Sequence, residues 1–107
     1  MSAKRMKQID RRMARIKAAL SQIGPLRPGS LTRQYKDRPN KTGAYWQISY
    51  TRQNKSRTEY VREEWVEEIR RQIATHKQFK RLIDEWIDLS IERSKLTMQS
   101  AEPGATA

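Results

Sequence analysis

The sequence predicts an α+β fold in which a helix, a three-stranded antiparallel sheet and a second, longer helix follow one another. Apolar residues recur with helical spacing over residues 2–23 and again over residues 62–96. Between these stretches, apolar and polar residues alternate over residues 44–52, as in a half-buried strand. We expect the two helices to pack like a coiled coil, in a single domain over residues 1–97 with a disordered tail over residues 98–107.

The first helix has one apolar and one basic face. Its apolar residues are spaced alternately three and four apart, which is the seam of a coiled-coil-like helix. They are Met6, Ile9, Met13, Ile16, Leu20 and Ile23. Gly24 and Pro25 end the run. Outside the seam the side chains are almost all basic, and they include Arg11, Arg12 and Arg15.

The central strand is predicted over residues 44–52. One face presents Trp46, Ile48 and Tyr50, which we interpret as core. The opposite, polar face presents Tyr45, Gln47, Ser49 and Thr51. A preceding short strand is expected over residues 31–35, with a polar loop over residues 36–43. A turn over residues 53–55 then leads into a returning strand over residues 57–61.

The long helix begins with four glutamates over residues 63–68, where the helix dipole favours anions. It is roughly 50 Å long against roughly 30 Å for the first helix, which therefore cannot cover all of it. Its distal half is apolar on more than one side and needs a further partner. We predict a homodimer or a helical protein partner, with the interface formed by Leu82, Ile83, Trp86, Ile87 and Ile91.

Net charge is the most informative bulk property. The 107 residues carry a formal charge of +11. By segment, residues 1–23 carry +6, residues 24–62 carry +7 and residues 63–107 carry −2. A positive field of this strength favours a polyanionic partner, and nucleic acid is the most abundant polyanion in a cell. Charge alone leaves acidic proteins and anionic membranes open as partners.

Several classes of function are not expected. The chain has no cysteine and a single histidine, His76, so thiolate and histidine-based metal sites are excluded. No nucleophile with a plausible base and no phosphate-binding glycine loop is present, and we therefore predict a non-enzymatic protein without cofactor or metal. No signal peptide or transmembrane run is recognisable, which predicts a cytoplasmic protein that does not act at a membrane.

A basic sheet face or two-stranded ribbon fits the DNA major groove. There an arginine can pair with guanine, Gln47 can pair with adenine, and the remaining cations can hold phosphates. The candidate contacts are Arg27, Arg33, Lys41, Tyr45, Gln47, Arg52, Lys55 and Arg57, with Arg11, Arg12 and Arg15 on the first helix. In the alternative interpretation, Tyr45 and Gln47 only cover a solvated face.

Three segments carry a resemblance to a small uncharacterised family of bacterial and archaeal proteins found near transposases and other mobile elements. They are the turn over residues 23–31, the Gly43–Gln47 strand and the Lys55–Thr58 return strand. The resemblance spans residues 20–92 and implies the same order of elements. Many members of that family have a cysteine cluster where this chain has residues 36–42, so a metal in that loop is not expected here.

The arrangement of three strands followed by a helix, over residues 29–74, also resembles the arm-type DNA-binding domains of tyrosine recombinases and plant AP2 domains. These read the major groove with the sheet face, which implies Arg33, Gln47, Arg52 and Arg57 as the positions to test. Our hypothesis is a double-stranded DNA-binding protein, accessory to a mobile element or phage. The alternative is a protein-interaction module that acts through the helical pair, and RNA as the ligand stays open.

Overall fold

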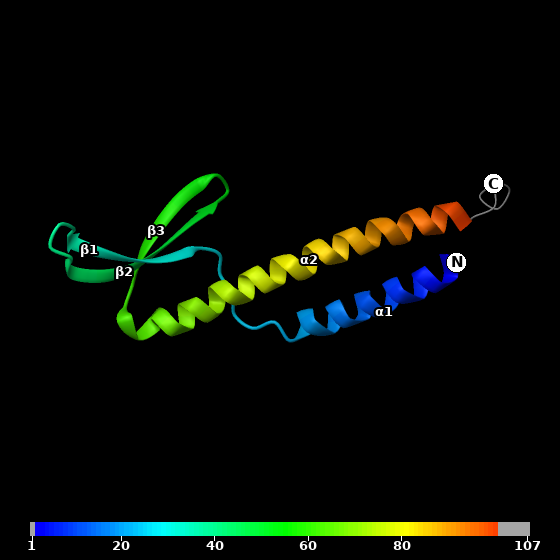
Figure 1. The fold of residues 1–107 in the computed structure, drawn as a ribbon, viewed down its shortest axis with the longest axis horizontal. Coiled ribbons are helices and arrows are strands. Elements are labelled where there is room, and N and C mark those ends of the chain that lie inside the picture. The colour runs from blue at the N-terminus through cyan, green and yellow to red at the C-terminus, as the bar shows by residue number, and fades with distance from the viewer. Residues whose placement is uncertain (1, 101–107) are drawn as a thin grey trace. The chain divides into compact units, whose positions relative to one another are not determined.

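The computed structural model describes residues 2–100 and confirms the predicted α+β fold (Figure 1). The elements are α1 (Ser2–Ser21), β1 (Ser30–Asp37), β2 (Thr42–Arg52), β3 (Lys55–Val61), a single 3-10 turn (Glu63–Trp65) and α2 (Val66–Ser100). Residues 98–100, predicted to belong to the tail, are the last residues of α2, and residues 101–107 lie outside the described part. Neither helix is long and apolar enough to cross a membrane.

The described residues form two compact units, and the single domain expected over residues 1–97 stays a prediction. One unit contains the sheet and the first part of α2, residues 24–78. The other contains α1 together with the rest of α2, residues 2–23 and 79–100. Each unit is described by itself below.

The sheet is antiparallel, with β2 between β1 and β3. All three strands lie side by side only at Trp46–Ser49, the part of β2 that pairs with both neighbours. On one side of this centre β2 pairs with β1 alone, which forms a two-stranded first ribbon over residues 34–45. On the other side it pairs with β3 alone, which forms a second ribbon over residues 50–57. The two ribbons project from the centre in different directions (Figure 1).

Short turns close both ribbons. Gln53 and Asn54 have positive φ angles of 52° and 63°, the conformation of a two-residue hairpin turn that matches the twist of its strands. The turn predicted over residues 53–55 is therefore one residue too long, because Lys55 already pairs with Arg52. In the first ribbon, Asp37 accepts hydrogen bonds from the backbone and side chain of Asn40 within the turn over residues 38–41. The loop predicted over residues 36–43 is therefore half strand, because β1 continues to Asp37 and β2 begins at Thr42.

The core of the sheet unit is small and lies between the sheet and the start of α2. Ile48 is fully buried, and Val61 and Val66 are nearly so. Leu31, Trp46, Ile69 and Ile73 pack around them. Gly29 closes the cluster, since its φ of 143° and the 2.7 Å that would separate an added Cβ from Cγ1 of Ile48 both require glycine. The prediction that Ile48 is a core residue is confirmed.

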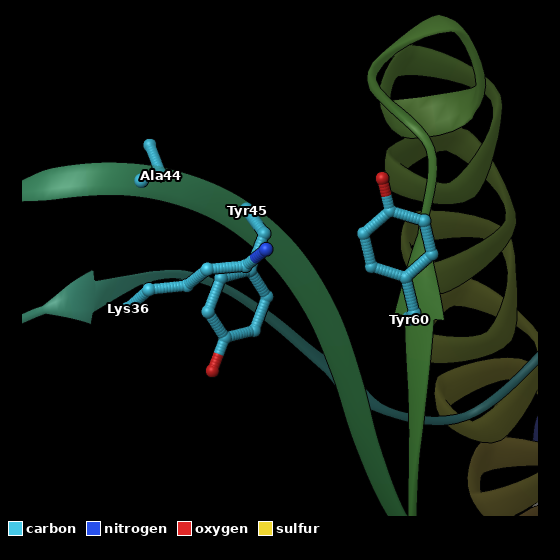
Figure 2. Close-up of a pocket in the computed structure, with 5 residues that line it drawn as sticks. Lys36, Ala44, Tyr45 and Tyr60 are labelled. Carbon is cyan, nitrogen blue, oxygen red and sulfur yellow. The ribbon is translucent and has the colours of Figure 1, made fainter.

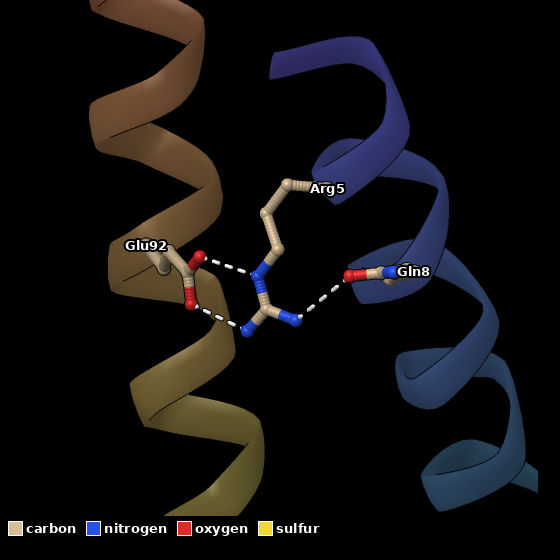
Figure 3. Close-up of polar contacts among 3 residues, drawn as sticks. All are labelled: Arg5, Gln8 and Glu92. Carbon is tan, nitrogen blue, oxygen red and sulfur yellow. Dashed lines mark hydrogen bonds and ion pairs between the residues drawn. The ribbon is translucent and has the colours of Figure 1, made fainter. Parts of the chain in front are cut away.

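The helical unit packs α1 against the distal part of α2 around Ile9 and Ile16, both fully buried. Three ion pairs join the helices and show that they run antiparallel. Arg5 donates two hydrogen bonds to Glu92 at 2.6 and 2.8 Å and a third to Gln8 on its own helix (Figure 3). Arg12 holds Glu85 in the same two-bonded way, and Arg93 donates to Asp10 at 2.8 Å.

These ion pairs predict that the helical unit loses stability in acid. The hydrogen bonds from Arg12 and Arg5 lower the pKa of Glu85 and Glu92, respectively, below their ordinary value. Since the pKa is lower in the folded state, the pairs stabilise it above about pH 4.3, where glutamate is ionised in the unfolded chain, and this contribution is lost as the pH falls through the folded pKa. We expect the E85Q/E92Q variant to melt below wild type at pH 7, with a smaller difference at pH 3, in thermal melts followed by circular dichroism. An equal difference at both pH values would contradict this.

Candidate nucleic-acid interface

The strand register assigns every residue of the sheet to one of two faces. Residues directly opposite each other in an antiparallel pair share a face, and successive residues of a strand alternate between faces. Ile48 lies opposite Leu31 on one side and Glu59 on the other, so this is the face that packs on α2. Gln47 lies opposite Thr32 and Tyr60, and these belong to the other, open face. No side chain on the open face is buried, and within residues 24–78 no element packs on it.

The open face is rich in hydroxyl and amide groups. Its residues are Ser30, Thr32, Gln34, Lys36, Tyr45, Gln47, Ser49, Thr51, Ser56, Thr58 and Tyr60. The hydroxyls of Ser49 and Thr58 lie 3.3 Å apart, and Gln34 donates to Thr32 at 3.2 Å. Gln47 makes no side-chain hydrogen bond to the rest of residues 2–100. Its amide is therefore free to bind a ligand.

A shallow hollow of about 510 Å³ opens on this face where the first ribbon leaves the centre. Lys36, Tyr45 and Tyr60 stand around it, each projecting from a different strand (Figure 2). Tyr60 is 69% exposed, which is unusual for a large aromatic side chain on a sheet. Lys36 is the only charged residue of the open face among the described strands.

The face toward α2 contains most of the sheet's ion pairs and cation–π contacts. Arg27 binds Glu59 at 2.7 Å and lies 5.1 Å from the ring of Tyr50. The hydrogen bond from Arg27 lowers the pKa of Glu59, with a smaller contribution from the Tyr50 hydroxyl. Arg27 also joins the loop before β1 to α2, through its backbone N–H and the carbonyl of Gln72. Arg27, which was predicted to contact phosphate, therefore has a structural role in the sheet unit.

Four of the predicted contacts lie on a different face from the one expected. Arg33 pairs with Trp46, Arg57 with Tyr50, and Arg52 with Lys55, which places all four on the α2 side of the sheet. The prediction that these cations share a face with Tyr45 and Gln47 is therefore wrong. For Lys55 and Arg57 in β3 the reason is the two-residue turn, because a shift of one residue in a strand moves all of its side chains to the opposite face. Arg52 lies on that side by alternation from Tyr50 within β2, and Arg33 lies there through its pairing with Trp46.

The two ribbons nevertheless gather exposed cations at their ends. Three belong to the first ribbon and three to the second: Lys36, Arg38 and Lys41, then Arg52, Lys55 and Arg57. All six side chains are exposed, and none forms an ion pair within residues 2–100. Only Asp37 offsets them within the ribbons. Arg33 is also exposed, 5.9 Å from the ring of Tyr35 at the sheet's edge.

The predicted contacts on α1 include both paired and unpaired cations. Arg12 is held by Glu85, whereas Arg11 and Arg15 are exposed and form no ion pair within the described residues.

The residues on α2 that were predicted to form a protein interface differ in their exposure. Ile87 and Ile91 are about half exposed, while Leu82, Ile83 and Trp86 are partly buried.

A family model described as a domain of unknown function, DUF6788, matches residues 6–71. The chain belongs to the DUF6788 family. The match covers most of α1, the whole sheet and the start of α2. No curated protein and no protein of solved structure matches the chain. Association with mobile elements and likeness to recombinase arm domains stay predictions.

Three residues of this DUF6788 domain belong to the candidate interface and were not predicted. Lys36 and Arg38 fell in a stretch expected to be a loop. Their positive charge was the only feature of the sequence that could have indicated a role in the interface. Tyr60 precedes the buried Val61 in β3, so strand alternation would have placed it on the open face. Trp65, in the turn before α2, is another large aromatic side chain that is exposed, at 55%.

Proposed function

We propose that this DUF6788 protein binds double-stranded DNA, with the open face of the sheet directed into the major groove. The observation that supports this most is the separation of roles on the sheet. Six exposed, unpaired cations stand on the two ribbons, and the face between them is composed of hydroxyl, amide and phenol groups. Cations hold phosphates and set the register, while neutral donors and acceptors read base edges.

The spacing of the cations favours a long polyanion over a compact anion. β2 has 11 residues, so at about 3.3 Å per residue the two turns are separated by roughly 35 Å along the strand. No single phosphate group or nucleotide can contact both groups of cations over that length. A DNA duplex carries phosphates along its whole length and can contact both.

The shape of the ribbons favours the major groove. This groove is about 12 Å wide and accepts a two-stranded ribbon, whereas the minor groove is about half as wide. Beyond the three-stranded centre, residues 51–57 are all exposed, so the second ribbon is free on both faces. Arg52, Lys55 and Arg57 can then reach the backbone beside the groove from the α2 side of the ribbon. Their assignment to that face is compatible with phosphate contact but excludes them as neighbours of Gln47 in base reading.

Gln47 is the residue we propose as the base reader. It occupies the centre of the open face between Thr32 and Tyr60, and its amide has no partner among the described residues. A glutamine amide can donate to and accept from the edge of adenine. Action in the cytoplasm, as an accessory factor of a mobile element, belongs to the same proposal, and the sequence resemblance supports the association with mobile elements.

Salt dependence tests the proposal directly. If all six ribbon cations contact phosphates, log K for a short DNA duplex should fall with log salt concentration at a slope of about −5. Gel-shift titrations over a salt series measure this slope. No retardation at low salt would contradict DNA binding. Duplex RNA should compete poorly, because its deep, narrow major groove does not admit side chains, and equal competition would contradict groove insertion.

A further inference from the structure

An apolar stripe runs along the distal part of α2. It consists of Ile83, Ile87, Ile91 and Met98, with the small residues Ser90 and Ser94 between them, at spacings of three and four residues. Ile87 is 48% exposed, Ile91 50% and Met98 67%. Trp86 and Lys95 border a shallow hollow of about 550 Å³ over the same residues. Within the helical unit, nothing among residues 2–23 and 79–100 covers this stripe.

The stripe and α1 lie on different faces of α2. Glu85 and Glu92 hold α1 through ion pairs, and they are seven residues apart, which is two turns along one face. Ile87 comes two residues after Glu85, and Ile91 comes two residues before Arg93, which pairs with Asp10 of α1. Two residues correspond to a rotation of roughly 200°, so both isoleucines are turned to the far side of the helix from α1. The helical unit has only two fully buried side chains, Ile9 and Ile16. Two helices with so small a core gain from a second layer on the exposed side.

We propose that the stripe is the interface with a second copy of this chain, whose α2 runs antiparallel across it. The twofold axis would pass between Ser90 and Ile91. A twofold interface brings the same surface of both copies together, so the surface must complement itself. The stripe meets this condition in shape and in charge.

Shape complementarity follows from the order of large and small residues. With the axis between residues 90 and 91, Ile87 of one copy lies opposite Ser94 of the other, and Ile91 lies opposite Ser90. These two isoleucines therefore each meet a serine, which allows the two helices to approach closely. Ile83 lies opposite Met98, the two apolar residues at the ends of the stripe. A contact over residues 83–98 is roughly 22 Å long.

Charge complementarity selects the antiparallel direction. Asp84, Asp88 and Lys95 are spaced by four and seven residues, which places them along one border of the stripe. In the antiparallel pair, Lys95 of one copy lies opposite residue 86 of the other, between Asp84 and Asp88. In a parallel pair, this border would instead lie across from the opposite border of the partner's stripe, so Lys95 would not meet Asp84 or Asp88.

Sedimentation velocity over a concentration series, in the absence of nucleic acid, tests the association separately from the proposed DNA binding. We expect the full chain to dimerise reversibly and the I87E/I91E variant to sediment as a monomer with unchanged helical circular dichroism. The matched control is A14E/A18E, which adds the same charges to exposed positions of α1 and should remain dimeric. A wild-type monomer at every concentration, or a dimeric I87E/I91E variant, would overturn the proposal.

Crosslinking tests the direction, since the chain has no native cysteine. A disulfide requires Cα atoms within about 7 Å. Ser90→Cys should crosslink two copies on oxidation, because residue 90 lies beside the axis. Met98→Cys should not, because its counterpart in the antiparallel pair is roughly 22 Å away. Crosslinking through Met98→Cys would show a parallel pair, and crosslinking through neither position would exclude a second copy on the stripe.

Discussion

Replacement of Ile48 by alanine is expected to destabilise the sheet unit by about 2–5 kcal/mol. Ile48 is one of only three buried residues in that unit. It belongs to a cluster formed by residues of the sheet and of α2. The substitution removes three carbon atoms from a site where an added Cβ on Gly29 would already lie 2.7 Å from the side chain. Small domains are stable by only about 5–15 kcal/mol, so this loss is a large fraction of the total.

Urea unfolding measures the effect, with tryptophan fluorescence as the probe because Trp46 and Trp65 both belong to the sheet unit. Ile91→Ala is the matched control, since it makes the same chemical change at a half-exposed position. At concentrations where the chain is monomeric, the control should cost less than about 1 kcal/mol. Equal losses for the two variants would mean that Ile48 is not at the centre of a packed core.

The helices and the central strand could be predicted from the sequence because each depends on a local period. The three-and-four spacing in α1 and the alternation around Ile48 are visible in short windows, and both predictions are confirmed. The end of α2 was placed too early because residues 98–100 lack strong apolar signals apart from Met98. The division into two units could not be predicted, since it depends on which contacts form between segments far apart in sequence.

The candidate interface was only partly predictable because its faces depend on turn length. Residues such as Gln47 and Tyr45 were assigned to the polar face from alternation within β2, and the register agrees. For β3 the face depends on whether two or three residues form the turn, and Gln53 with Asn54 adopts the shorter form. Pairing of Arg12 with Glu85 and of Arg27 with Glu59 also depends on tertiary contacts, so composition alone overstated the number of free cations.

Reversing the charge of two cations on the second ribbon, in the K55E/R57E variant, is expected to reduce DNA affinity about 100-fold at moderate salt. Both side chains are exposed and unpaired, so their removal disturbs no described ion pair. Each lost phosphate contact should also lower the steepness of the salt dependence by about one, which predicts a slope about two smaller than in wild type. A reduced slope identifies lost phosphate contacts, whereas a misfolded variant would lose binding without this signature.

The control variant K77E/R81E changes net charge by the same amount on exposed positions of α2. If binding depended only on the overall field of the molecule, both variants would weaken it equally, because long-range attraction follows total charge. If the ribbons contact the duplex, K77E/R81E should retain most of the affinity and the full slope. The ratio of the two affinities, measured at one salt concentration with folding verified by thermal melts, therefore distinguishes a defined DNA-contacting surface from a merely basic protein.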